Sequence, residues 1–105
     1  MDKRITSVIK KYIDSVAKQN PDLVAAYLFG SYAKNKEHDE SDIDIAIVIN
    51  HLNDVDKFDL QVQLMLLASQ FDTRIEPHPI SKLDLLSNNP FIAEIKKTGI
   101  EISIK

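Results

Sequence analysis

The sequence predicts a domain of the α/β (α+β) class, in which a mixed sheet of about four strands is flanked by helices. Short apolar runs of strand length alternate with longer segments in which apolar residues recur every three or four positions. No repeat, low-complexity tract or flexible linker interrupts this order. The chain has 105 residues, of which 44% are hydrophobic, so we expect residues 1–105 to form a single domain.

The first two elements are a helix and a buried strand. A helix with one buried face is expected from the spacing of its apolar residues, which are Ile5, Val8, Ile9, Tyr12, Ile13, Val16 and Ala17. It should end near Asn20, because Pro21 cannot continue a helix. The apolar run from Leu23 to Phe29 then predicts a short strand that is buried on both faces.

A turn and a loop are expected next. Gly30 and Ser31 follow the strand directly, and the Ser31 hydroxyl is a suitable N-cap for a short helix. The polar run from Lys34 to Ser41 favours a loop.

The segment from Asp42 to Asn50 alternates with a period of two, which predicts a second strand. Its isoleucines share one face. The opposite face carries Asp42, Asp44, Ala46 and Val48.

The remaining chain predicts two helices and two strands. Asn53 or Asp54 caps a helix that runs to about Gln70, with one apolar line at Phe58, Val62, Met65 and Leu66 and a second at Leu60, Leu64 and Leu67. The segment TRIEPHPI favours a third strand that ends near Glu76 or lies at a sheet edge, because its prolines cannot donate to a ladder. Asn89, Pro90 and Gly99 delimit another helix, and residues 100–104 form the last strand.

Composition and charge exclude several classes of protein. The net charge of −3 provides no general attraction to the phosphates of a long nucleic acid. No segment approaches the roughly 20 apolar residues that a membrane span needs, and no secretion signal is visible. The absence of cysteine excludes a disulfide scaffold and agrees with a cytoplasmic location.

Asp42 and Asp44 are the most informative residues, because an unpaired carboxylate is costly in a buried strand. Residues i and i+2 of a strand point the same way with Cα atoms roughly 6.6 Å apart, so the two carboxylates converge. A divalent cation relieves their repulsion, and Mg²⁺ binds one or two protein carboxylates together with substrate phosphates. The competing interpretation is a solvated strand start, with Asp44 capping a loop or pairing with Lys34 or Lys36.

The turn at Gly30 and Ser31 is a candidate phosphate site. Free backbone N–H groups at a helix start attract anions, glycine permits close approach, and the serine hydroxyl adds a donor. The competing interpretation is an ordinary turn. This turn and the paired aspartates flank consecutive strands, so together they indicate a triphosphate held between a turn and metal-binding carboxylates.

The stretch GSYAKNKEHDESDIDIAIV resembles the signature of the DNA polymerase beta-like nucleotidyltransferases. It is most similar to the minimal nucleotidyltransferase branch, whose usual form is GSxARGxxxxxSDIDL, and it matches at Gly30, Ser31, Ala33, Ser41, Asp42, Ile43 and Asp44. Lys34 stands where that branch often has arginine. Asn35 stands where it has glycine, and asparagine also tolerates the left-handed conformation.

The resemblance implies a set of site residues. Three carboxylates would hold two Mg²⁺ ions in this family, which assigns Asp42 and Asp44 together with Glu76 from the third strand. Gly30, Ser31, Lys34 and Ser41 would contact the nucleotide. Asp72 is the rival third ligand, and the alternative for Glu76 is an exposed partner of Arg74. His78 could face the same side of the strand as Glu76 or simply end the strand between two prolines.

The resemblance also implies an activity and a partner. The expected reaction transfers AMP from ATP to a hydroxyl of a partner protein. The expected partner is a HEPN-domain toxin, which the chain would neutralise as an antitoxin. The expected assembly is a hetero-oligomer with this toxin, and a homodimer of the chain is the second assembly considered. The alternative is a catalytically weak or inactive module that neutralises its partner by binding alone.

Overall fold

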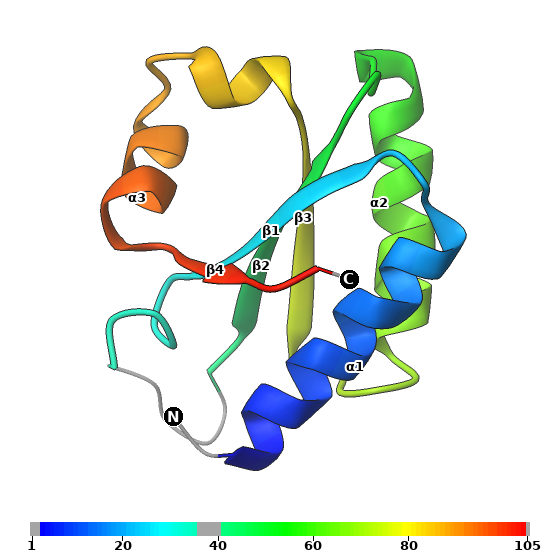
Figure 1. The fold of residues 1–105 in the computed structure, drawn as a ribbon, viewed down its shortest axis with the longest axis vertical. Coiled ribbons are helices and arrows are strands. Elements are labelled where there is room, and N and C mark those ends of the chain that lie inside the picture. The colour runs from blue at the N-terminus through cyan, green and yellow to red at the C-terminus, as the bar shows by residue number, and fades with distance from the viewer. Residues whose placement is uncertain (1–2, 36–40, 105) are drawn as a thin grey trace.

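Residues 3–35 and 41–104 are described by a computed structural model, and four strands and three α-helices make up the fold (Figure 1). The helices are α1 (Lys3–Gln19), α2 (Asp54–Ala68) and α3 (Pro90–Thr98), and a short 3₁₀ helix, η1 (Leu83–Leu86), precedes α3. The strands are β1 (Leu23–Phe29), β2 (Ile43–Ile49), β3 (Ile75–Ser81) and β4 (Ile100–Ile102). The predicted fold class is confirmed, whereas η1 was not predicted.

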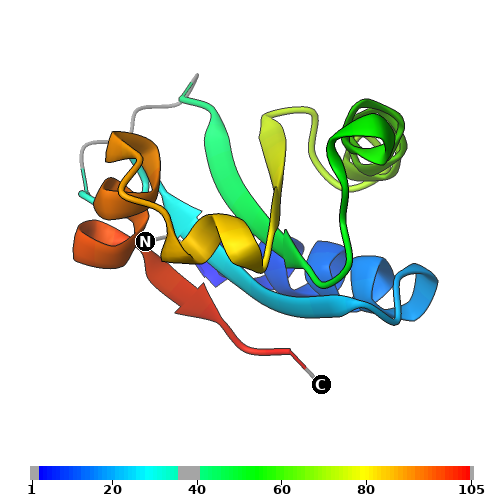
Figure 2. The same ribbon diagram turned by 90° about the horizontal axis from the view of Figure 1, so that it is seen from above.

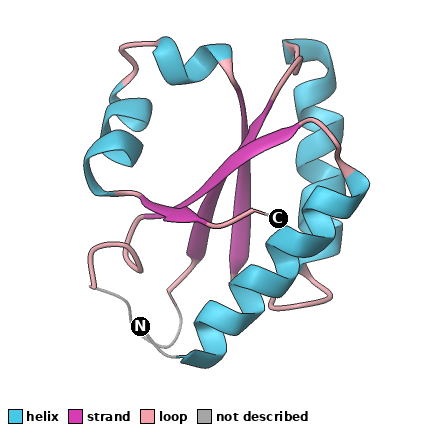
Figure 3. Ribbon diagram, viewed as in Figure 1, coloured by secondary structure: helices cyan, strands magenta, loops and turns pink. Residues whose placement is uncertain are grey.

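The four strands form one mixed sheet in the order β3-β2-β1-β4. Strand β1 pairs antiparallel with both β2 and β4, while β2 and β3 pair in parallel. The crossover between the parallel strands is α2, as a parallel connection requires. The strands pass between the helices as a twisted sheet (Figure 3).

Each face of the sheet has its own core. The isoleucines of β2 pack with buried side chains of α1 and α2 in the larger cluster, whose members include Tyr12, Ile13, Val16, Leu64 and Leu67. The opposite face packs Ala46 and Val48 of β2 against α3, through Ile92 and Ile95. Figures 1 and 2 show α3 on the other side of the sheet from the two long helices. The predicted alternation of β2 is therefore confirmed.

The caps of the helices follow the sequence. The Asn53 side chain accepts a hydrogen bond from the Asp56 amide at 2.9 Å, and Asn89 accepts one from the Phe91 amide at 2.8 Å. Pro90 begins α3 and Gly99 caps its end, as predicted. The third strand continues through both prolines to Ser81, and it does so because β3 is a sheet edge.

Three sequence predictions need correction. Residues 30–35 form hydrogen-bonded turns in place of the helix expected at Ser31, and the Lys34 amide donates to the carbonyls of Gly30 and Ser31. The last strand ends at Ile102, not at residue 104. Only one of the two apolar lines of α2 is buried, because Leu64 and Leu67 face the core while Phe58 and Leu66 are exposed. Most of the predicted loop at residues 34–41 lies outside the described residues.

No described helix is both long and apolar enough to cross a bilayer.

Candidate active site

Asp44 and Glu76 are neighbours across the parallel pair of strands. The register of β2 and β3 places their Cα atoms opposite each other. Both residues lie on the face opposite Ile43 and Ile75, which are buried in the larger core. Ligand-type atoms of Asp44, Glu76 and His78 all lie within 4.8 Å of one another. The sheet register therefore brings together two of the three carboxylates that the resemblance implied.

Asp42 lies immediately before β2, where its side chain is exposed. It is outside the group formed by Asp44, Glu76 and His78, but its carboxylate lies near enough to Glu76 to raise the pKa of that side chain. Burial raises the pKa of Glu76, the neighbouring Asp42 and Asp44 carboxylates raise it further, and His78 acts in the opposite direction. The three acids therefore form a cluster whose negative charges disfavour each other, as expected of a cation site.

Gly30 makes room for the Asp44 carboxylate. It adopts a φ of +73°, and a Cβ atom at this position would lie 2.5 Å from Asp44 Oδ2. The strand register causes this approach, because Phe29 is the Cα partner of Asp44 in β1. The sequence assigned Gly30 to close approach of a phosphate, and the structure gives it a second role as the neighbour of a site carboxylate.

The other residues expected to contact nucleotide differ in burial and in their partners. Ser31 is half-buried in the turn after Gly30, and Ser41 is buried one residue before Asp42. The Lys34 ammonium forms an ion pair with Glu94 of α3. Asn35 has a φ of 55°, the left-handed conformation expected where related sequences carry glycine.

Arg74 contacts Asp72, which the sequence left as the rival third ligand. Its guanidinium binds Asp72 through two hydrogen bonds, Nε to Oδ1 at 3.0 Å and a second nitrogen to Oδ2 at 2.7 Å. The side-chain hydrogen bond from Arg74 lowers the pKa of Asp72. Arg74 also donates to the hydroxyl of buried Tyr32 at 3.3 Å. Asp72 is thus engaged by Arg74.

His78 is the site residue whose role the sequence left undecided. Its Nε2 lies 3.2 Å from Asp44 Oδ1, and its ring packs edge-on against Phe29 with a centroid distance of 5.1 Å. Phe91 of α3 packs against the same two rings. The spacing of two residues from Glu76 is the signal in the sequence, but the parallel register that places His78 beside Asp44 is not readable there.

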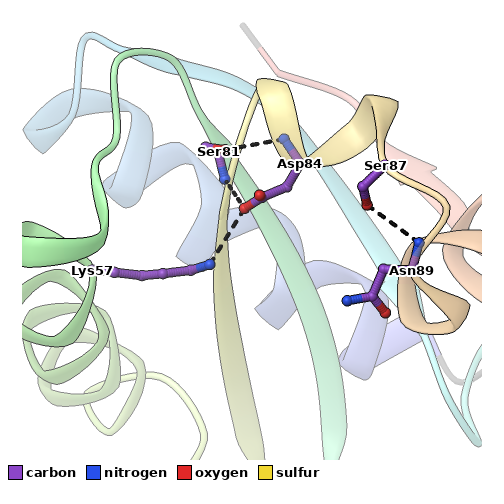
Figure 4. Close-up of polar contacts among 5 residues, drawn as sticks. All are labelled: Lys57, Ser81, Asp84, Ser87 and Asn89. Atoms are coloured by element: carbon purple, nitrogen blue, oxygen red, sulfur yellow. Dashed lines mark hydrogen bonds and ion pairs between the residues drawn. The ribbon is translucent and has the colours of Figure 1, made fainter.

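A cavity of about 540 Å³ opens beside the cluster, between α2, β3, η1 and α3. Its walls include His78, Phe58, Phe91 and Lys57. Figure 4 shows Lys57 reaching from α2 to Asp84, which lies 3.3 Å away and also accepts the Ser81 amide. The cavity therefore combines aromatic walls with charged groups next to the candidate metal ligands, as small-molecule sites do.

This sheet order, with carboxylates on adjacent strands behind a glycine-serine turn, is the arrangement of a nucleotidyltransferase. The family described as polymerase beta, nucleotidyltransferase matches residues 11–105. The chain belongs to this family, and the resemblance seen in its sequence is confirmed.

Solved structures show the same fold. A chain from a toxin-antitoxin complex with AMP-PNP is 26% identical with a TM-score of 0.61, and the match covers 91% of this chain and 73% of that one. A protein from Sulfolobus solfataricus that was assigned as a nucleotidyltransferase has a TM-score of 0.64 at 24% identity. The match covers 93% of this chain and 78% of that one.

A third similar structure contains a tri-AMPylated Shewanella oneidensis HEPN toxin in complex with an MNT antitoxin. The matched chain has a TM-score of 0.57 at 23% identity, and the match covers 95% of this chain and 73% of that one. No protein of curated function matches the sequence.

Proposed function

We propose that this protein is a metal-dependent nucleotidyltransferase that transfers AMP from ATP to a hydroxyl group of a partner protein. The observation that carries the proposal is the cross-strand pairing of Asp44 with Glu76, with Asp42 directly before β2. Two adjacent strands contribute these acids to one sheet face, which is a rigid platform for a metal site.

The chemistry of the donor set fits Mg²⁺. Carboxylate oxygens are hard ligands of the kind Mg²⁺ prefers. Burial and the neighbouring carboxylates both raise the pKa of Glu76, and a bound cation would remove the repulsion between the carboxylates. Asp42, Asp44 and Glu76 would hold two ions. His78 would orient the Asp44 carboxylate through the contact between its Nε2 and Asp44 Oδ1. Bound Mg²⁺ supplies charge stabilisation at the transferring phosphoryl group and lowers the pKa of the attacking hydroxyl.

Gly30 and Ser31 would bind the β and γ phosphates of ATP, and Ser41 would add a further contact to the nucleotide. Lys34 would leave Glu94 to contact a phosphate, which is feasible because both side chains of this pair are partly exposed to solvent. The acceptor oxygen forms a bond to the α-phosphorus while the bond from that phosphorus to the bridging oxygen breaks. Pyrophosphate leaves with the electron pair, and Glu76 accepts the proton of the hydroxyl.

The proposed acceptor and partner is a HEPN-domain toxin encoded beside this chain, which acts as its antitoxin in a hetero-oligomer. The sequence resemblance to the minimal nucleotidyltransferase branch supports this partner. Further support comes from the similar structure in which a tri-AMPylated HEPN toxin is bound to an MNT antitoxin.

The decisive experiment is transfer of label from ³²P-labelled ATP to the HEPN-domain protein in the presence of Mg²⁺. We expect label on the partner with the unmodified chain and none with Asp44→Asn. Asp22→Asn, an exposed aspartate before β1, is the matched control and should retain full transfer. Neutralisation of the toxin without any transfer, equal in all three proteins, would establish the alternative in which the chain acts by binding alone.

A further inference from the structure

We propose that the outer face of α2 docks an amphipathic helix whose apolar seam is flanked by basic residues and which belongs to the partner protein. The inference rests on the proposed function only for the identity of that partner. The docking surface itself follows from exposure, spacing and charge on α2.

The outer face of α2 carries a continuous apolar line that is exposed among the described residues. Val55 is 85% exposed, Phe58 74% and Leu66 65%. We call this line the α2 stripe, and its members are Val55, Phe58, Val62, Met65 and Leu66. The core needs none of them, because a second line of the same helix, which includes Leu64 and Leu67, packs inside. A helix that is apolar on two sides exposes one side for another protein.

The spacing of the α2 stripe indicates a helical occupant. Successive members lie three and four residues apart at positions 55, 58, 62 and 65, which is the a/d spacing of a coiled-coil seam. An apolar seam of this kind receives the i, i+3, i+4 and i+7 side chains of a partner helix.

The charges beside the stripe indicate that the partner helix is basic. Asp54 and Asp59 flank the stripe on its two sides near the start of α2, and both are exposed. Asp59 lies beyond the first turn, where the helix dipole no longer favours an acid. The only cation of α2, Lys57, is paired with Asp84 at 3.3 Å. Within residues 3–35 and 41–104, no ion pair engages Asp54 or Asp59.

A second copy of this chain is a poorer occupant than a basic helix. In a parallel pair of α2 helices, the aspartates of the two copies would face each other. In an antiparallel pair they would meet residues 60–68 of the other copy, which contain no charged residue. Neither arrangement gives Asp54 or Asp59 a cation, so charge complementarity favours a different protein.

The α2 stripe also adjoins the candidate active site. Phe58 belongs to the stripe and lines the 540 Å³ cavity, and His78 lines the same cavity while contacting Asp44. A helix bound along α2 would therefore lie beside a cavity whose wall includes His78, the residue that contacts Asp44. Docking there would hold the acceptor chain beside the site at which its hydroxyl is modified.

The test uses two synthetic helical peptides of about four turns, the length of α2. Both carry the same leucine seam, and one is flanked by lysines while the other is flanked by glutamates. Binding to the full chain is measured by fluorescence anisotropy without ATP or Mg²⁺. We expect the lysine peptide to bind about tenfold or more tightly than the glutamate peptide.

Variants locate the surface. Leu66→Lys and Asp59→Lys should each weaken binding of the lysine peptide by about tenfold. Leu86→Lys changes an equally apolar residue of η1 that is 79% exposed but lies off the stripe, and Asp22→Lys reverses a charge elsewhere; both should bind normally. The HEPN-domain partner should follow the same pattern in co-purification.

The outcomes separate this inference from the proposed function. Asp44→Asn should bind the lysine peptide as the unmodified chain does, so a failure of AMP transfer leaves the docking surface intact. Equal binding of both peptides, no binding of either, or normal binding by Leu66→Lys would overturn the inference. So would a dimer in sedimentation that dissociates on Leu66→Lys, because that result assigns the stripe to a second copy.

Discussion

Replacing Gly30 with alanine tests whether the turn after β1 positions the Asp44 carboxylate. The added Cβ would lie 2.5 Å from Asp44 Oδ2, which is about 1 Å shorter than an ordinary van der Waals contact. The alanine must also adopt a φ near +73°, which disfavours the folded state by about 1–2 kcal/mol. The carboxylate or the turn must therefore move by a substantial part of that 1 Å.

We expect Gly30→Ala to lose AMP transfer by about 100-fold, since a 1 Å misplacement at a reacting centre has an effect of that size. The free energy of unfolding, measured with urea, should fall by only about 1–2 kcal/mol. The assay is the initial rate of label transfer from ATP at saturating Mg²⁺, at a temperature where both proteins are folded.

The other glycine of the chain provides the control. A Cβ at Gly99 would clash with the Ile95 carbonyl oxygen at the end of α3, and its three nearest atoms all belong to Ile95. Gly99→Ala should lose stability with little change in transfer by the folded protein. The reasoning is refuted if Gly30→Ala keeps its rate within about twofold, or if Gly99→Ala loses as much activity.

Three further predictions concern contacts around the site. Arg74 lowers the pKa of Asp72 below its ordinary value of 3.8, so this carboxylate stabilises the fold above pH 3.8 and loses that contribution as pH falls through its lower folded value. Asp72→Asn should therefore reduce the free energy of unfolding by about 1–3 kcal/mol at pH 7, and the difference from the unmodified protein should shrink in acid; a constant difference at all pH values would contradict this. Lys34→Ala should change stability by less than about 1 kcal/mol, because its pair is partly exposed, while raising the KM for ATP; an unchanged KM would remove Lys34 from the phosphate site. His78→Phe preserves an aromatic ring beside Phe29 but removes the contact to Asp44, so kcat should fall about tenfold with little change in Tm, and an unchanged kcat would show that the contact has no catalytic role.

Local sequence determined most of the elements and indicated the candidate site residues. The period of two in residues 42–50 predicted which side chains of β2 share each face of the sheet, and the asparagine caps and Pro90 predicted where helices begin. Gly30, Asp42 and Asp44 were identified from a short signature. These features depend on neighbouring residues along the chain, so they are readable without the fold.

The relations between distant segments were decided only by the tertiary structure. The parallel register of β2 and β3 places Asp44 beside Glu76 and His78, although more than thirty residues separate them in the chain. The pairing of Arg74 with Asp72 and the exposure of Leu66 beside buried Leu67 depend in the same way on which surfaces meet. Strand register and helix docking are set by the packing of the whole core, and that packing leaves no pattern in any single segment.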